Sequence, residues 1–295
     1  MTSVVPFCTG ALFGSSVPFT GGGTVHGSMP VASDTITGMA LIDERHIREL
    51  AAEHGVPEAV ADEMAGQLRP CVYLVRHEEL PRKEDARPAA RTGGLPELPA
   101  GVDWPSGGEP LVLTIDCAEL PRDVLDFPLP ADGQLLVFTD MSYPPDSSAV
   151  LHVPAGVPTT EHPATYTVDG EARESTVYEP RTLYPVPGLT IGPDWSDLPE
   201  SEKFLDGDPD NEEVLDRFED AVLHGVHGEP RSDWIQLGGY SRPWQMPPDA
   251  DGLILLAQIQ GDAVEYGIYT LNLVVGTRED IAAGRYENLQ YEQQY

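Results

Sequence analysis

Basic side chains are scarce in this chain of 295 residues, which has 17 Lys and Arg against 49 Asp and Glu and a formal net charge of −32. Only Lys83 and Lys203 are lysines. A surface with this charge repels phosphate groups, so the composition disfavours direct binding to nucleic acid or to an anionic membrane. It favours a basic protein as partner, and a general need for solubility is the alternative explanation.

Long apolar runs are also missing. No stretch approaches the ~18 uninterrupted apolar residues that a membrane-spanning helix needs. Residues 1–38 contain no Lys or Arg, so they lack the basic region that opens a secretory signal peptide. Cysteine is limited to Cys8, Cys71 and Cys117, without a Cys-x-x-Cys spacing. These absences predict a cytoplasmic protein with free thiols.

The first 38 residues lack pattern as well as charge. They are rich in Gly, Ser and Thr, and they hold a single acid, Asp34. No helix or strand period runs through them. We therefore expect a disordered extension at 1–38, with Met39, which opens the first patterned region, as an alternative start.

What the chain does contain is strand periodicity. It is 40% apolar and has 29 Gly and 29 Pro, a composition typical of short strands joined by turns. Strands are predicted from 71 and at 110–116, 133–139, 149–153, 164–168, 173–178, 182–191, 252–259, 266–275 and 286–292. Helices are predicted at 43–54, capped by Asp43 and ended by Gly55; from Pro57 until Pro70; at 209–222, capped by Asp208; and at 278–283, capped by Thr277 with Asp280 in its first turn.

One pattern occurs twice. Each copy has a Gly-Gly turn, then an apolar strand, then a second strand led by a glycine. The first copy uses 93–94, 110–116 and 133–138, and the second uses 238–239, 255–260 and 267–271. Such self-similarity indicates one supersecondary unit used twice around a shared core. At Gly93, Gly94, Gly238 and Gly239 we expect positive φ or a backbone approach too close for a Cβ. The alternative is that these glycines leave room for a ligand.

The ordered combination of these motifs resembles the YwqG-like family, the DUF1963 domain. The resemblance rests on Thr92-Gly93-Gly94-x-Pro96-x-Leu98-Pro99, Trp104-Pro105, the run ending Ile115-Asp116, Gly133-x-Leu135-x-x-Phe138, Gly238-Gly239-Tyr240 and Leu256-Ala257-Gln258-Ile259. It covers about residues 69 to 295. It implies a mostly β, internally duplicated, soluble bacterial domain, and it supplies no established catalytic residue. Thr114 stands where the family has Gln before the first Ile-Asp, and Gln260 stands where it has the second Asp.

These observations predict a mainly β fold, at the margin of α+β: an internally duplicated sheet or roll with short N-terminal helices. Residues 39–295 form one domain in this prediction. Its first repeat covers about 69–192 and its second 233–295, and an acidic helical insertion at 194–224 lies between them.

Carboxylates at strand ends are the candidates for catalysis. Asp116, Asp140 and Asp262 each follow an apolar run. Converging there, Asp116 and Asp140 could act as an acid–base pair, whereas strand-end Asp residues commonly cap turns. Tyr240 and Trp244, beside the second Gly-Gly pair, are candidate contacts for a ligand or partner, with packing as the alternative. Asp262 is a third candidate contact.

No metal or cofactor is expected. The Asp206-x-Asp208-x-Asp210 run begins like a calcium loop but has Arg217 at the twelfth position, where such a loop needs a bidentate Glu. His224 and His227 with nearby Glu229 lack the further ligands of a zinc site.

Two function classes stay open. One is a non-enzymatic interaction module whose acidic surface sequesters a basic protein, as an immunity protein does. The other is a hydrolase or small-molecule-binding enzyme that uses convergent carboxylates between the repeats. The sequence leaves the oligomeric state open.

Overall fold

The computed structural model describes residues 43–295 except 81–82, 106, 122, 146, 193–197 and 228–233, and it leaves the side chains of 226–227 undescribed. The predictions made for residues 1–38 and for Glu229 lie outside the described residues. The same holds for the first part of the acidic insertion.

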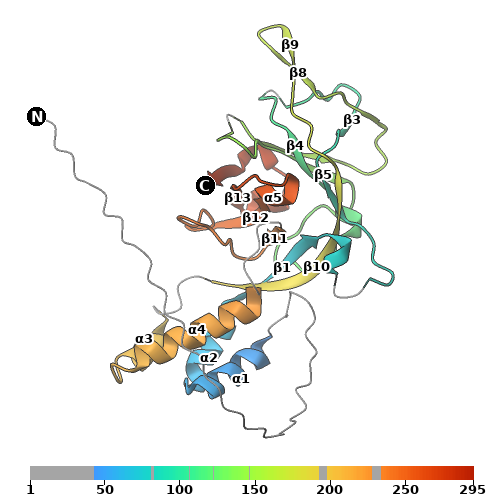
Figure 1. Ribbon diagram of the computed structural model, residues 1–295. Coiled ribbons are helices and arrows are strands. Elements are labelled where there is room, and N and C mark those ends of the chain that lie inside the picture. Colours follow the sequence, from blue (N-terminus) through green and yellow to red (C-terminus); the bar gives the residue numbers. More distant parts are fainter. Residues whose placement is uncertain are drawn as a thin grey trace, which may run out of the picture. The chain divides into compact units, whose positions relative to one another are not determined.

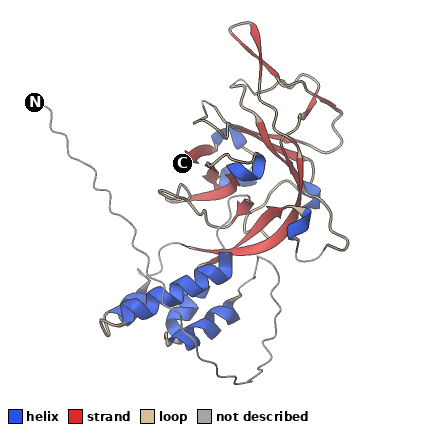
Figure 2. Cartoon of the chain, viewed as in Figure 1, coloured by secondary structure: helices blue, strands red, loops and turns tan. Residues whose placement is uncertain are grey.

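One ten-stranded antiparallel sheet forms the body of the described chain (Figures 1 and 2). Its spatial order is β14-β13-β12-β11-β1-β10-β2-β4-β5-β6. The strands are β1 (Leu68–Val75), β2 (Ala90–Thr92), β4 (Leu111–Asp116), β5 (Gln134–Phe138), β6 (Ala149–Val153), β10 (Arg181–Ile191), β11 (Ile235–Gly238), β12 (Leu253–Gln260), β13 (Leu271–Thr277) and β14 (Gln290–Gln294). Two further pairs are β3 (Glu97–Pro99) with β7 (Thr159–Glu161) and β8 (Thr165–Val168) with β9 (Glu171–Glu174). The predicted mainly β class is confirmed.

The duplication is interlocked within this sheet. β1 and β10 pair with each other at the centre; on its other side β1 pairs with β11, and β10 pairs with β2. Outward from this centre, β2-β4-β5-β6 on one side mirrors β11-β12-β13-β14 on the other. The symmetry makes β10 the counterpart of β1 and places it with the second repeat, whereas the prediction from the sequence includes it in the first repeat at about 69–192. The strands of each repeat therefore form an unbroken part of the sheet only when the first strand of the other repeat is inserted among them: β10 lies between β1 and β2, and β1 lies between β10 and β11.

Irregularities of pairing recur at equivalent places. The register of β4 against β5 shifts between Leu111 and Leu113, and the register of β12 against β13 shifts between Leu255 and Ala257. A bulge bends a strand and increases its twist. The two equivalent bulges therefore curve both halves of the sheet alike.

Both Gly-Gly turns have a left-handed backbone. The φ angle is +55° at Gly93, +76° at Gly94, +67° at Gly238 and +73° at Gly239. L-residues with a Cβ adopt this region at a cost of about 1–2 kcal/mol, which explains glycine at these positions. The predicted positive φ is confirmed at all four.

A side chain of the preceding strand braces each turn in the same way. Arg91 donates from Nη1 and Nη2 to the carbonyls two and four residues later, at 2.7 and 2.6 Å. Gln236 donates from Nε2 to the carbonyls two and four residues later, at 2.7 and 2.9 Å. Different side chains thus make the same pair of bonds in the two repeats.

The concave side of the curled sheet holds one apolar core shared by both repeats. In Figure 1, β12 and β13 lie opposite β4 and β5 across this core. It joins residues such as Val112, Leu135 and Val137 of the first repeat to Leu256, Ile259 and Val274 of the second. Each outer face carries a smaller cluster of its own, around Leu136 and Phe138 in one repeat and around Leu255 and Leu273 in the other.

Four helices pack together around a second apolar cluster. They are α1 (Glu44–His54), α2 (Glu58–Ala65), α3 (Pro199–Leu205) and α4 (Asn211–His227). Their buried side chains include Ile47, Met64 and Phe218, which join Ile191 of β10. The carboxylate of Asp43 accepts a bond from the His46 amide at 3.0 Å, and Gly55 ends α1 with φ +78°. Both caps of α1 agree with the sequence prediction.

Several predicted boundaries are wrong. The second helix ends at Ala65, and Pro70 lies within β1, where it follows the helix rather than stopping it. The helix predicted at 209–222 is α4, which begins at Asn211. Asp208 does not cap it directly, because its carboxylate accepts a bond from the Asp210 amide in the turn before the helix. The strand predicted at 173–178 is β9, four residues at 171–174.

The second repeat also starts its strands later than predicted. Residues 261–264 form α5 (Gly261–Val264), and β13 begins at Leu271. Cys117 donates to the Gly133 carbonyl just as Gly261 donates to the Thr270 carbonyl, so Thr270 rather than Gly267 is the counterpart of Gly133. The last strand begins at Gln290 because η3 (Tyr286–Asn288) precedes it. The remaining short elements are η1 (His77–Glu79), η2 (Cys117–Glu119) and α6 (Arg278–Ala282).

Candidate binding groove at the seam of the sheet

The two ends of the curled sheet approach each other along a seam. β6 and β14 are the terminal strands, and β6 contacts η3 just before β14. Across the seam, the Gln293 side chain donates to the Asp140 carbonyl at 2.8 Å. Burial raises the pKa of Tyr291 to about 12, and the Val150 amide near its hydroxyl acts in the opposite direction. Side chains, rather than a backbone ladder, therefore link the two ends.

Two adjoining pockets lie along this seam, and together we call them the seam groove. The first, of about 490 Å³, has Pro144, Pro145, Ser147 and Ser148 on one side and Leu289–Gln293 with Tyr295 on the other. The second, of about 450 Å³, is lined by Ser142, Pro144, Gly267, Ile268, Tyr269, Thr270, Gln293 and Tyr295. Pro144, Gln293 and Tyr295 line both, so the two pockets adjoin.

Exposed tyrosines gather at this groove. The exposed fractions are 68% for Tyr269 and 76% for Tyr295, which line the groove. They are 73% for Tyr143, next to Pro144, and 85% for Tyr266, next to Gly267. Exposed aromatic rings with a polar tip are enriched where proteins bind one another. The rings of Tyr269 and Tyr295 therefore suit the groove to contact with another protein.

Two of the predicted carboxylates hold the loops that form the groove. The Asp140 carboxylate accepts bonds from the amides of Ser142 at 2.6 Å and Tyr143 at 3.0 Å. The Asp262 carboxylate accepts a bond from the Gly267 amide at 2.6 Å. Both act as turn caps, the alternative that the sequence left open, and each fixes one wall of the groove.

The structure does not bring Asp116 and Asp140 together. Asp116 ends β4 opposite Gln134, the first residue of β5, whereas Asp140 lies two residues beyond the far end of β5. Six residues of extended chain from Gln134 to Asp140 span about 20 Å. Asp116 caps η2 by accepting a bond from the Ala118 amide at 3.0 Å. The prediction that these two carboxylates form an acid–base pair is therefore wrong. Consecutive antiparallel strands end on opposite sides of the sheet, so residues that follow them lie far apart.

The two aromatic candidates occupy different environments. The Tyr240 ring packs against Arg69, whose guanidinium carbon lies 4.0 Å from the ring centroid, and its amide donates to Thr190 Oγ1 at 2.8 Å. Trp244 is 48% exposed, and its amide donates to Gln294 Oε1 in β14 at 2.6 Å. Tyr240 therefore packs on the central strands, and Trp244 lies on a loop attached to the strand that borders the groove.

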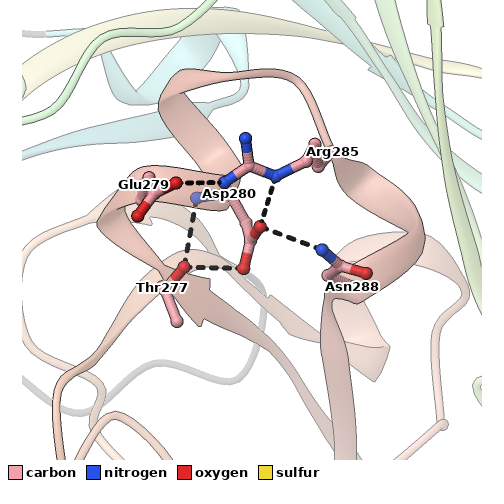
Figure 3. A network of polar contacts seen from close by, with 5 residues as sticks. All are labelled: Thr277, Glu279, Asp280, Arg285 and Asn288. Atoms are coloured by element: carbon pink, nitrogen blue, oxygen red, sulfur yellow. Dashed lines mark hydrogen bonds and ion pairs between the residues drawn. The ribbon is translucent and has the colours of Figure 1, made fainter.

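A polar network fixes the connection that leads into β14 (Figure 3). The Asp280 carboxylate accepts bonds from the Thr277 hydroxyl at 2.7 Å, from Arg285 Nε at 2.7 Å and from Asn288 Nδ2 at 2.9 Å. Arg285 also binds Glu279 at 2.8 Å. Led by the Thr277 bond, these donors lower the pKa of Asp280 to about 2. The sequence predicted the Thr277 cap, but it gave no sign of Arg285 and Asn288, which come after the helix.

Apart from the groove, a further pocket lies beneath the loop between η2 and β5. Its volume is about 390 Å³, and Val72, Leu120 and Phe127 give it an apolar floor, with Asp123 and Asp126 at its border. Arg278 of the second repeat binds Asp126 through a side-chain contact of 2.8 Å and through the Asp126 carbonyl.

Some kinds of site are absent from the part of the chain that the structure describes. There, no three His, Cys, Asp or Glu side chains are grouped so that they could bind a metal ion. None of the helices in these residues has the length and apolar character to cross a membrane. Cys71 and Cys117 are buried free thiols, and burial raises their pKa values to about 12 and about 11.

Comparison with known proteins identifies the family. The model of a domain of unknown function, DUF1963, matches residues 90–294, so the chain belongs to the DUF1963 family. The matched segment runs from the first residue of β2 to the last of β14. No curated protein matches the chain.

Proposed function

We propose that this protein is a non-enzymatic binding module that sequesters a basic protein partner through its acidic surface, in the manner of an immunity protein. We also propose that it acts in a bacterial cytoplasm. The excess of 49 acidic over 17 basic residues supports the choice of partner.

The observation that carries the proposal is the role of the strand-end carboxylates, which bind backbone amides instead of converging. Asp116, Asp140 and Asp262 all cap turns, and the space between the repeats is filled by one apolar core. A hydrolase needs its acid and base within reach of one substrate bond. The geometry of these three residues favours a scaffold over such a site.

The test is affinity capture from an extract of the source organism at low and higher salt (about 50 and 300 mM), where screening separates weak from specific charge contacts. A basic protein should be retained and, once purified, should bind with a defined stoichiometry in calorimetry. An unrelated protein of equal net charge serves as the control. If both baits retain the same set of proteins, only general charge attraction is at work and the proposal is wrong.

The alternative of a small-molecule-binding enzyme keeps one supporting observation, the pocket of about 390 Å³ bordered by Asp123 and Asp126. A library of small metabolites screened by thermal shift tests it. A compound that raises the melting temperature of the natural chain, but not that of Asp123→Asn, would favour the enzyme over the binding module.

A further inference from the structure

We propose that the seam groove binds an extended basic segment of the partner protein, which adds as a strand to the free edge of β14. This inference rests on the proposed function and names the site and the form in which the partner binds.

The backbone of β14 provides the first argument. Among the residues that the structure describes, β14 is the terminal strand of the sheet, and its ladder to β13, from Leu271↔Gln294 to Val275↔Gln290, uses only one of its two edges. An unused edge presents N–H and C=O groups that can pair with another extended chain.

The opposite wall of the groove is poorly suited to pair with this edge itself. It begins with Pro144 and Pro145, which have no backbone N–H to donate. The wall and β14 enclose about 490 Å³ between them. The edge of β14 therefore forms one side of the groove, and the opposite side leaves this edge open for an incoming chain.

The adjoining pocket supplies contacts for side chains. Alternate side chains of an added strand point to the same face, so one of them would enter the space of about 450 Å³ between Tyr269, Tyr295 and Pro144. On binding, the two tyrosine rings would cover the apolar surface of this side chain while their hydroxyl groups stay in water. This pocket favours an aliphatic side chain, or the apolar stem of an arginine, at that position.

Charge selects a basic segment. The described residues that line the two parts of the groove include no Lys or Arg, whereas Glu292 does line it. The carboxylates of Asp140 and Asp262 bind the amides of Ser142 and Gly267, which both line the second pocket, so two more carboxylates stand beside the groove. A second copy of a chain with net charge −32 would be repelled.

The experiment measures binding of an octapeptide of alternating Arg and Val, with blocked ends, to the full chain at physiological salt. We expect saturable 1:1 binding and shifts of the β14 backbone amides in NMR spectra. The same peptide with N-methyl groups on every second residue keeps its charge but cannot complete a ladder. It should bind at least about tenfold more weakly.

Matched variants locate the site. Tyr269→Ala with Tyr295→Ala should weaken binding about tenfold. Tyr266 is more exposed than either but is not among the residues that line the groove, so Tyr266→Ala should change binding less than about twofold. Glu292→Gln should weaken binding more than Glu212→Gln on α4, which removes the same charge. None of the five positions is buried, although Glu292 is half-buried, and unchanged melting temperatures would verify that the variants fold.

Equal binding of the N-methylated peptide would overturn strand addition, and equal effects of Glu292→Gln and Glu212→Gln would overturn the placement in the groove. If the octapeptide fails while affinity capture still yields a specific basic partner, the groove assignment is wrong and the proposed function stands. If both fail, the proposed function itself is wrong.

Discussion

Replacing Gly239 by Ala tests whether the Gly-Gly turns are structural. The residue has φ +73°, and a Cβ there would overlap Thr190 Oγ1 and lie 3.1 Å from the Cys71 Cβ. The Thr190 hydroxyl cannot simply rotate away, because it donates to the Arg69 carbonyl at 3.2 Å and accepts from the Tyr240 amide at 2.8 Å.

Gly252 offers a matched control. Its φ is +89°, yet a Cβ at this position would meet nothing within 4 Å. Gly252→Ala should therefore cost only the left-handed strain, about 1–2 kcal/mol in the free energy of unfolding. Gly239→Ala adds the loss of up to two hydrogen bonds of about 1 kcal/mol each, for a total of about 3–4 kcal/mol.

The assay is urea unfolding followed by tryptophan fluorescence, since Trp234 is buried beside Cys71 in the same apolar cluster. The difference between the two variants in free energy of unfolding separates the cost of the Cβ contacts at Gly239 from the cost of the left-handed backbone, which both positions share. Equal losses in both would show that Thr190 and Cys71 make room at no cost. A Gly239→Ala chain with unchanged stability but impaired binding would instead support the ligand-site alternative.

Two further predictions concern acid stability and the N-terminal segment. Because its folded pKa is lowered to about 2, Asp280 stabilises the fold fully above its unfolded pKa, near 4, and loses this effect as the pH falls towards 2. The difference in unfolding free energy between the natural chain and Asp280→Asn should thus be constant from about pH 5 to 8 and shrink below pH 4; a difference that persists at pH 2 would contradict this. A chain that starts at Met39 should keep the melting temperature of the full chain in calorimetry, and a loss of several degrees would show that residues 1–38 stabilise the domain.

Much of the fold could be predicted from local pattern. Apolar runs of strand length such as 110–116 and 252–259 became strands within one residue. Both strands are buried on both faces, so a nearly continuous apolar run marks them in the sequence. β2 and β11 were missed, since they are only three and four residues long and lie beside glycines. Their partners in β10 and β1 lie about a hundred residues or more away, and no local signal carries such a pairing.

The site was predictable only in part. Asp140 and Asp262 were identified from their position after strands, but the sequence did not show that their loops meet at one seam. Strand direction could have separated Asp116 from Asp140 at the outset, because consecutive antiparallel strands end on opposite sides. The tyrosines of the groove carry no period or motif, so only the curl of the sheet brings them together.

The interlocked topology leads to a last prediction about fragments. A cut after residue 178 separates the repeats, so residues 43–178 keep β1 and β2 but lose β10, which lies between them in the sheet. Alone, neither 43–178 nor 179–295 has a continuous sheet, and each should lack cooperative unfolding.

Mixed together, these two fragments should form a 1:1 complex with the strand signal of the intact chain. Fragment 43–192 is the control, because it retains β10 and therefore the continuous order β1-β10-β2-β4-β5-β6. It should show more strand in circular dichroism than 43–178, although half of the shared core is missing. If 43–178 unfolds as cooperatively as 43–192, the first repeat does not need β10, and the two repeats are joined by core packing rather than by exchange of their first strands.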